Sequence, residues 1–278
     1  MKQQKTYQAS WECPSNIALI KYWGKKAPQL PLNPSISFSL KEARTKTSVE
    51  IIPSGERKVS FLFEGKPSGF ADRIEKYLAT LAEEETWLNN YSFHIESSNT
   101  FPHSTGIASS ASAFGALALC LADLKNQITG TNLMASEFYE HASEWARMGS
   151  GSACRSVYPR FAIWGDYHKF TGTSNFHAVP LSEKIHPDYF TLRDAILLVD
   201  SAKKKVSSSA GHQLMNNHPF KDARIKQAID HTGALLQAMK TGDHEQFFSI
   251  VEKEALSLHS MMLTSEPSFI LLLPNSLA

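Results

Sequence analysis

The chain has 278 residues, of which 42% are hydrophobic and 20% charged, so it can bury a core and does not have the composition of a disordered protein. Lys and Arg number 28 against 27 Asp and Glu, a net charge of +1, which argues against general binding to nucleic acid. The three cysteines lack disulfide or metal spacing, there is no secretory signal, and no apolar run could span a bilayer. We therefore expect a cytoplasmic protein with neither a membrane nor a nucleic-acid partner.

Strands are predicted mainly in the first half of the chain, where apolar residues are consecutive or alternate with polar ones. The segments concerned are Asn16–Lys21, Ser35–Leu40, Ser48–Ile52, Lys58–Glu64, Tyr91–Glu96 and Phe161–Gly165. In Ser35–Leu40 the serines alternate with apolar residues, which predicts a strand buried on one face. The turn residues Pro53–Glu56 predict that the strands before and after them form a hairpin.

Helices are predicted where apolar residues recur every three or four positions. These segments are Phe70–Trp87, Ala111–Lys125, Asn132–Met148, Pro219–Lys240 and Asp243–Leu263. Asp243 is a plausible N-cap for the last of them.

The pattern of predicted elements changes near residue 185, from strands interrupted by helices to one strand and two long helices. This change predicts two domains, residues 1–185 and 186–278. The second contains one strong strand, Ala195–Asp200, and two long helices. A single strand cannot pair its own N–H and C=O groups. It must join the sheet of the first domain or pair with strands that this sequence does not contain.

Two stretches of small polar residues predict anion binding. Residues 97–112 are rich in Ser and Thr and lead directly into a helix, whose first N–H groups favour a phosphate. An ordinary capped helix is the alternative. In Met148–Ser156, two glycines and three serines surround Arg155, whose guanidinium suits carboxylate or phosphate. Its alternative is a helix end with a surface arginine, and Cys154 there is expected to be a packed thiol.

Two further stretches place lysines beside small or aromatic residues. If Asn16–Lys21 is a strand, Lys21 lies on its apolar face and needs an anion, or else extends to solvent. Tyr22 and Trp23 would form walls, and Gly24 would allow a sharp turn. Residues 203–205 are lysines that precede three serines and a predicted helix start, which suits an anion or a solvated surface. Together, the four stretches favour a small polyphosphate substrate.

The motifs resemble those of a known family of small-molecule kinases. Pro102-x-x-x-Gly106-Ile107-x-Ser109-Ser110-Ala111 is similar to the phosphate loop of the GHMP kinases. The stretches Asn16–Lys25, Gly149–Ser156 and Lys204–Ser209 resemble the diphosphomevalonate decarboxylases within that superfamily. The resemblance extends over about residues 7–273.

This resemblance implies a fold and a reaction. The fold would be α+β: a two-domain GHMP kinase fold with an N-terminal domain like ribosomal protein S5 domain 2 and a ferredoxin-like C-terminal domain that is incomplete in this chain. The reaction would use ATP and Mg²⁺ to phosphorylate the 3-hydroxyl of 5-diphosphomevalonate, and loss of phosphate and CO2 would then give isopentenyl diphosphate. A homodimer is an assembly that the resemblance also implies.

The resemblance also implies roles for individual residues. Lys21 and Arg155 would be catalytic, and Ser104, Gly106, Ser109, Ser110 and Ser112 would bind ATP. The residues that would bind the substrate are Asn16, Tyr22, Trp23, Gly24, Lys25, Arg73, Ser150, Gly151, Ser152, Ala153, Cys154, Arg155, Ser208 and Ser209. No metal ligand is assigned.

One expected motif is missing from the sequence. The family has a catalytic aspartate in an Asp-x-Gly-Pro-Asn type motif near its C-terminus, and this sequence contains no such motif. We therefore expect a chain that is shorter than its family at the C-terminal end. Two alternatives stay open: a related mevalonate or phosphomevalonate kinase or decarboxylase, and a ligand-binding protein without turnover.

Overall fold

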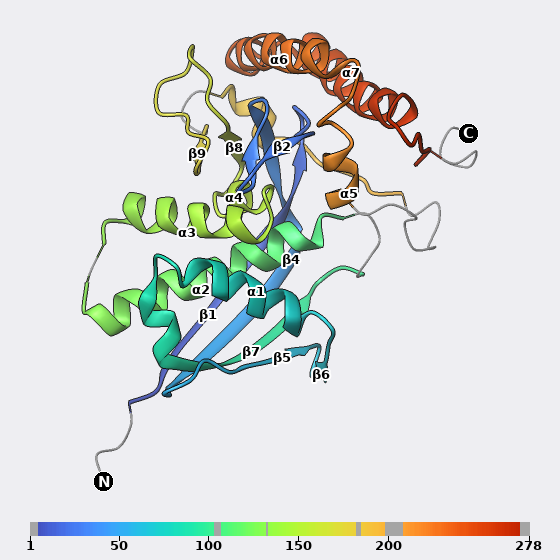
Figure 1. The fold of residues 1–278 in the computed structure, drawn as a ribbon. Helices are drawn as coiled ribbons and strands as arrows, with labels where there is room; N and C mark the ends of the chain where they lie inside the picture. The colour runs from blue at the N-terminus through green and yellow to red at the C-terminus, as the bar shows by residue number, and fades with distance from the viewer. Residues whose placement is uncertain (1–4, 103–106, 132, 182–184, 198–207, 273–278) are drawn as a thin grey trace. The chain divides into compact units, whose positions relative to one another are not determined.

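The computed structural model of the chain describes residues 5–102, 107–131, 133–181, 185–197 and 208–272 (Figure 1). Contacts along the chain define two compact units, which we describe one at a time. The first unit contains Met1–Asn16 and Ser39–Tyr158, and the second contains Ile17–Phe38 and Pro159–Ala278. These units do not follow the sequence boundary near residue 185, which stays a prediction.

The first unit is built on a sheet with the strand order β6-β5-β7-β4, in which β1 also pairs with β4. The strands are β1 (Tyr7–Ala18), β4 (Ser35–Pro53), β5 (Val59–Phe63), β6 (Lys66–Pro67) and β7 (Tyr91–Asn99). β7 runs antiparallel to β4, from Thr45 opposite Asn99 to Pro53 opposite Tyr91. Its alternating burial confirms the predicted strand over Tyr91–Glu96.

The hairpin predicted around Pro53–Glu56 is wrong. β7 occupies the edge of β4 that β5 would need, and β5 pairs with β7 in parallel instead. A nine-residue antiparallel register with β7 offers β4 more hydrogen bonds than the five residues of β5 could. A local turn signal was therefore overridden by a longer pairing between distant segments.

The strands predicted over Ser35–Leu40 and Ser48–Ile52 are two parts of one strand, β4. The expected polar face of the first part is also buried, since Ser35 is 0% and Ser37 1% exposed. Ser35 is accommodated there because its hydroxyl donates to the carbonyl of Ile20 at 2.5 Å. A serine can thus occupy a buried strand face when a main-chain acceptor lies within reach.

Helices of the first unit pack over this sheet (Figure 1). They are α1 (Ala71–Leu81), a 3-10 helix η1 (Thr86–Asn90), α2 (Ser109–Thr129), α3 (Ala135–Gly149) and the short α4 (Ala153–Ser156). α2 packs against α3 and α4, and its Cys120 donates to the carbonyl of Thr47 in β4 at 3.3 Å. All three helices predicted here are confirmed, although the first ends at Leu81 rather than Trp87.

The second unit contains short strands and two long helices. Its strands are β2 (Lys25–Lys26), β3 (Leu30–Pro31), β8 (Phe161–Trp164) and β9 (Ala178–Pro180), and its helices are η3 (Pro187–Thr191), α5 (Ser208–Gln213), α6 (Lys221–Thr241) and α7 (His244–Leu263). β2 and β3 form a hairpin, and β8 pairs with β9 and with Ser35–Phe38 of β4.

The apolar sides of α6 and α7 share one core with these strands. The fully buried residues of this core include Ile20, Ile36, Ile163 and Leu235. The Asp243 carboxylate caps α7 by accepting from the amide of Gln246 at 2.9 Å, which confirms the predicted N-cap. No helix in the described ranges is both long and apolar enough to cross a membrane.

The strand predicted over Ala195–Asp200 is not found where it can be checked. Ala195–Leu197 have no regular secondary structure, and Leu197 is 82% exposed. Leu198–Asp200 lie outside the described residues. An apolar run without a neighbouring strand to pair with does not form a strand on its own. The helix pair is covered instead by β8, β9 and the chain between β1 and β4, which the sequence boundary had assigned to the other domain.

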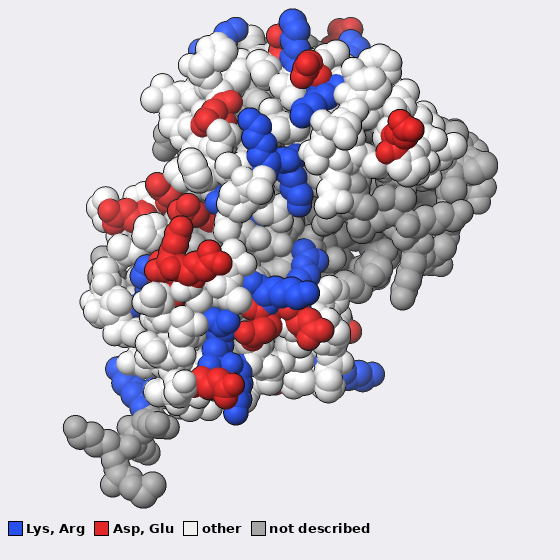
Figure 2. All heavy atoms as spheres, viewed as in Figure 1, with Lys and Arg blue, Asp and Glu red and all other residues white. Residues whose placement is uncertain are grey.

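Charged side chains of both signs are interspersed on the face that Figure 2 shows. This mixing agrees with the net charge of +1. Any strong attraction for an anion must therefore come from a local group of residues.

Gly115 of α2 lies against Cys13 of β1, and we predict that its replacement is costly. A Cβ at this position would overlap the sulfur of Cys13. Gly115→Ala should destabilise the protein by about 1–3 kcal/mol, because neither the helix nor the strand can move away freely. Urea unfolding measures this. In a Cys13→Ala background the cost should fall below about 1 kcal/mol, because the obstructing atom is removed.

Gly69 offers a matched control, since nothing lies within 4 Å of a Cβ built there. An equal cost for Gly69→Ala and Gly115→Ala would contradict the close approach of α2 to β1.

Candidate functional site

The start of α2 has the features of an anion site. Its N-cap, Ala108, offers no side-chain hydrogen bond to the first amides of the helix. The half-buried Ser109 and Ser110 supply hydroxyls in the first turn. The amides of Ser109 and Ala111 already donate to the carbonyls of Ile107 and Ala108, so the first turn attracts an anion mainly through its partial positive charge and its serine hydroxyls. Ser104 and Gly106, which were predicted to bind ATP, lie outside the described residues.

Ser112 differs from the two serines before it. It is fully buried, its hydroxyl lies 2.6 Å from that of Thr45 in β4, and it donates to the carbonyl of Ser109 at 3.2 Å. These contacts fix the start of the helix to the sheet. A direct role of Ser112 toward ATP stays a prediction.

The turn between α3 and α4 is held by the side chain of Asn16. The amide nitrogen of Asn16 donates to the carbonyl of Ser152 at 3.1 Å and to the hydroxyl of Ser156 at 2.7 Å. The guanidinium of Arg155 lies 3.5 Å from the amide oxygen of Asn16. Asn16 is 4% and Arg155 2% exposed. The structure therefore brings together two predicted site residues that are 139 positions apart.

The surroundings of Cys154 confirm that it is a packed thiol. Its sulfur donates to the carbonyl of Gly151 at 3.0 Å, and burial raises its pKa to about 12. A thiol with this pKa carries no nucleophilic thiolate at neutral pH. Ala153 beside it is also fully buried.

Two side-chain contacts join this turn to the helix starts around it. The hydroxyls of Ser110 in α2 and Ser150 lie 3.2 Å apart. Arg73 of α1 donates to the carbonyl of Gly149 at 3.3 Å and lies over the ring of Phe114, 4.8 Å from its centroid. Predicted ATP-binding and substrate-binding residues are thus direct neighbours in the first unit.

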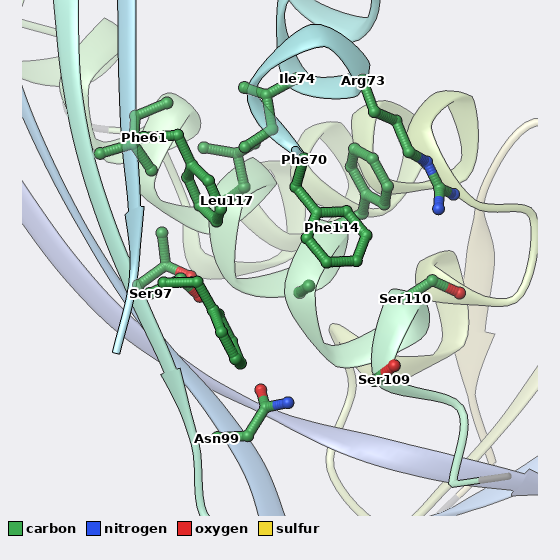
Figure 3. A pocket seen from close by; sticks show the side chains of 14 residues that line it. Phe61, Phe70, Arg73, Ile74, Ser97, Asn99, Ser109, Ser110, Phe114 and Leu117 are labelled. Carbon is green, nitrogen blue, oxygen red and sulfur yellow. The ribbon is translucent and has the colours of Figure 1, made fainter. Parts of the chain in front are cut away.

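A cavity of about 250 Å³ opens beside the start of α2. Its walls come from β5, β7, α1 and α2, and Figure 3 shows Phe61, Phe70 and Leu117 among the rings and apolar side chains that line it. Arg73 and Ser110 lie together at one side of the cavity in this view. Most of the lining is therefore apolar, with Arg73 and Ser110 at one side and the polar side chains of Ser97 and Asn99 elsewhere in the wall.

Lys21 lies beyond the end of β1 in the second unit. The prediction that it belongs to a strand is wrong, because β1 ends at Ala18. Its ammonium donates to the carbonyl of Ala18 at 2.7 Å. The main-chain amide of Lys21 donates to the carboxylate of Glu254 at 2.9 Å.

The residues after Lys21 pack around His212 of α5. The imidazole ring lies 4.3 Å from the ring of Tyr22 and 5.0 Å from that of Trp23, centroid to centroid. Gly24 donates its amide to Nδ1 of His212 at 3.0 Å. The φ of +85° at Gly24 confirms the predicted sharp turn.

The same imidazole is held in its neutral form. Burial and, secondarily, the positive charge of Lys25 lower the pKa of His212 to about 3. Lys25 itself donates to the side chain of Gln29 at 2.7 Å. Trp23 is 7% exposed and belongs to a small core with Met215 and Met262, so most of its ring is not a free wall.

α5 begins at Ser208, as the sequence predicts for the serines that follow the lysine run. The side chains of Ser208 and Ser209 lie outside the described residues, and so do the three lysines. Within the part of the chain that is described, no group of three or more His, Cys, Asp or Glu side chains could hold a metal ion.

Comparison with known proteins decides the family. The model of the diphosphomevalonate decarboxylase-like N-terminal domain matches residues 13–176, and that of the mevalonate 5-diphosphate decarboxylase C-terminal domain matches residues 195–277. The chain belongs to the diphosphomevalonate decarboxylase family. The predicted α+β GHMP kinase fold is thereby confirmed.

Individual members of this family agree. A diphosphomevalonate decarboxylase of Ganoderma lucidum is 34% identical over 94% of this chain and 67% of that protein. The solved mevalonate diphosphate decarboxylase of Staphylococcus aureus is 29% identical with a TM-score of 0.79, covering 98% of this chain and 79% of that one. A structure described as MDDEF in complex with MVAPP, AMPPCP and magnesium is 27% identical with a TM-score of 0.78, covering 98% and 80%.

Sequence reasoning missed two features, one in each unit. The cavity walls come from segments far apart in the chain, which no single motif marks. His212 is one of 11 histidines, and only its partner Gly24 and its burial distinguish it. The small residue Gly211 before it, packed against Trp23, was the available signal.

We predict that His212 makes this decarboxylase family member sensitive to acid. Its folded pKa of about 3 is below the usual 6.5, so below pH 6.5 the unfolded chain binds a proton that the folded chain does not. This lowers the free energy of unfolding at pH 5.5, relative to pH 7.5, by about 1.4 kcal/mol. His212→Gln should remove that loss, which urea unfolding at both pH values measures. The exposed His168 is the control: an equal effect of His168→Gln would contradict the assignment.

Proposed function

We propose that the chain performs the reaction for which its family is named. It binds ATP and 5-diphosphomevalonate, phosphorylates the 3-hydroxyl, and releases phosphate and CO2 to leave isopentenyl diphosphate and ADP. The observation that carries this proposal is the contact between Ser110 and Ser150, which joins an uncapped helix start to the turn that holds Arg155. This contact supports a phosphate-donor site with a second anion site beside it.

Two chemical steps have to be supported. A tertiary hydroxyl is a poor leaving group, and transfer of the γ-phosphoryl group of ATP turns it into a good one. When the phosphate departs with the C–O electron pair, positive charge develops at C3. The C–C bond to the carboxylate then supplies its electron pair, which forms the alkene and releases CO2. The protein contributes position and charge to both steps.

The ATP phosphates fit the start of α2. The hydroxyls of Ser109 and Ser110 are donors for phosphate oxygens, and the helix dipole favours their negative charge. Ser104 and Gly106 precede this helix in the sequence and Ser112 follows in it, and we assign all three to ATP as well. Bound phosphates bring Mg²⁺ with them, since this ion is usually held by phosphate oxygens, water and few protein groups. The serine hydroxyls are the oxygen ligands that the first turn offers.

The cavity beside α2 fits the base of ATP. Phe61, Phe70 and Phe114 provide flat apolar surface for a planar base. The side chains of Asn99 and Ser97 provide polar groups for its edge (Figure 3). A nucleotide lying with its base here would direct its phosphates toward Ser109 and Ser110.

The substrate fits the remaining residues that the resemblance singles out. The Arg155 guanidinium, aligned by Asn16, suits the carboxylate or a phosphate of diphosphomevalonate. Residues Ser150–Cys154 precede Arg155 in the chain, and Arg73 donates to the carbonyl of Gly149 just before them. We assign all of them substrate contacts. In the second unit, Lys21 is assigned to the reacting end. Tyr22, Trp23, Gly24 and Lys25 are assigned to the diphosphate, and Ser208 and Ser209 to the substrate phosphates.

The homodimer and the cytoplasmic location are further proposals. The first is supported by the family resemblance. The second is supported by sparse cysteines and the sequence composition.

A related kinase is the competing function, and one assay separates the two. With ATP and 5-diphosphomevalonate, the decarboxylase must release ADP and CO2 in equal amounts. Release of ADP without CO2, or turnover only with a monophosphate, would favour a kinase or a monophosphate decarboxylase. Tight binding of both ligands without either product would identify a ligand-binding protein.

We predict that Arg155→Ala lowers kcat by at least about 100-fold, because Arg155 is the one permanently charged residue in the segment 149–156. Steady-state kinetics and thermal unfolding measure the loss and show that the variant is folded. Arg160→Ala is the control, since Arg160 is exposed and five positions away. Near-normal kcat in Arg155→Ala would overturn the assignment of the turn.

We predict that Ala113→Leu raises KM for ATP about tenfold by filling the cavity that would receive the base. KM for diphosphomevalonate should stay within about twofold, because this residue lines only the nucleotide side. Ala135→Leu, at an exposed position in α3, is the matched control. An unchanged KM for ATP would place the base elsewhere.

A further inference from the structure

A fully buried carboxylate in the second unit has no role in the proposed chemistry. Glu254 of α7 is 0% exposed. One of its oxygens lies 2.9 Å from Nη1 of Arg224 and 2.7 Å from Nδ1 of His231. The other lies 2.6 Å from Nη2 of Arg224 and accepts the main-chain amide of Lys21 at 2.9 Å. The carboxylate thus connects α6, α7 and the segment after β1.

The main chain of Lys21 needs such an acceptor. The strand β1 ends at Ala18, and after it the amides of Leu19 and Ile20 both donate to the carbonyl of Ile36. A buried amide without an acceptor is costly, and the next residue in the chain cannot use the same ladder. Glu254 supplies the missing acceptor from a helix more than 230 positions away.

The other side of the same residue is also held. The side-chain amide of Asn33 donates to the carbonyl of Lys21 at 3.1 Å and to that of Pro34 at 2.7 Å. Asn33 is 3% exposed, so the donor side of this contact is buried. With both of its peptide groups bound, the backbone of Lys21 has one orientation, and so has the start of the Lys21–Lys25 segment.

Stability alone is a weak reason for this arrangement. Burying a carboxylate and a guanidinium costs much of the energy that their attraction returns, and apolar replacements of such pairs are often as stable. An apolar pair between α6 and α7 could not accept the amide of Lys21. The hydrogen bond to the main chain is what the carboxylate adds.

We propose that Glu254 is a positioning residue for Lys21. Its carboxylate, held by Arg224 and His231, fixes the main chain of Lys21 and so presents the Lys21–Lys25 segment to the substrate. This inference rests on the proposed function of that segment in binding diphosphomevalonate. Glu254 does not touch the substrate itself.

Hydrogen exchange of the unmodified protein gives the first test. The Lys21 amide should exchange about as slowly as the central amides of α7, because it shares a buried acceptor with that helix. An amide of Lys21 that exchanges as fast as those of exposed loops would overturn the proposal without any variant.

Two variants separate positioning from support of the helix pair. Glu254→Gln keeps the shape of the side chain but has one acceptor oxygen instead of two. It should speed exchange at Lys21 and weaken binding of diphosphomevalonate about tenfold by calorimetry, while ATP affinity changes less than about twofold. Arg224→Gln disrupts the same helix pair but leaves the carboxylate to accept the Lys21 amide. At a matched loss of thermal stability, it should weaken substrate binding less.

The controls distinguish the possible failures. Glu252→Gln, exposed on the same helix, should change neither exchange nor binding. Equal losses of affinity in Glu254→Gln and Arg224→Gln at equal stability would show a purely structural role and overturn the proposal. Lys21→Met tests the proposed function separately. If it binds diphosphomevalonate normally, the assignment of Lys21 fails; if it binds weakly while Glu254→Gln binds normally, only the positioning role fails.

Discussion

The conformation of the segment after β1 depends on hydrogen bonds from its main chain to groups outside the regular strand ladder. Beyond Ala18, the amides of two residues share one carbonyl of β4, and the next partners are side chains: Glu254 for the amide of Lys21, Asn33 for its carbonyl, and His212 for the amide of Gly24. Each of these side chains is buried. A candidate substrate-binding segment is thus shaped by polar groups that water cannot replace.

In the first unit, the candidate binding residues are positioned by the side-chain amide of Asn16 and by a small residue, Gly115. Asn16 satisfies a carbonyl, a hydroxyl and a guanidinium around the turn of Arg155. Glycine at position 115 lets α2 approach β1, and the fixed position of α2 sets where its first turn meets Ser150. The nucleotide and substrate contacts that we propose in this unit therefore share a scaffold of side-chain hydrogen bonds.

The sequence predicted the helices well because apolar periodicity and caps, such as that of Asp243, are local signals. The sharp turn at Gly24 was predicted for the same reason. It failed where distant segments compete: β7 displaced the expected hairpin, and Ala195–Leu197 found no strand to pair with. The motif residues Asn16 and Arg155 could be named in advance, but their contact could not. Glu254 carried no local signal and His212 only the small Gly211 before it, since their main-chain partners lie 233 and 188 positions away.

The contact between Gly24 and His212 has a consequence for the ring itself. Because the amide of Gly24 donates to Nδ1, that nitrogen must present a lone pair, and the proton of the neutral imidazole resides on Nε2. Protonating Nδ1 would set two donors against each other. Free histidine exchanges between two neutral tautomers. The fold stabilises the one protonated on Nε2, because the sharp turn at Gly24 places a main-chain donor against Nδ1.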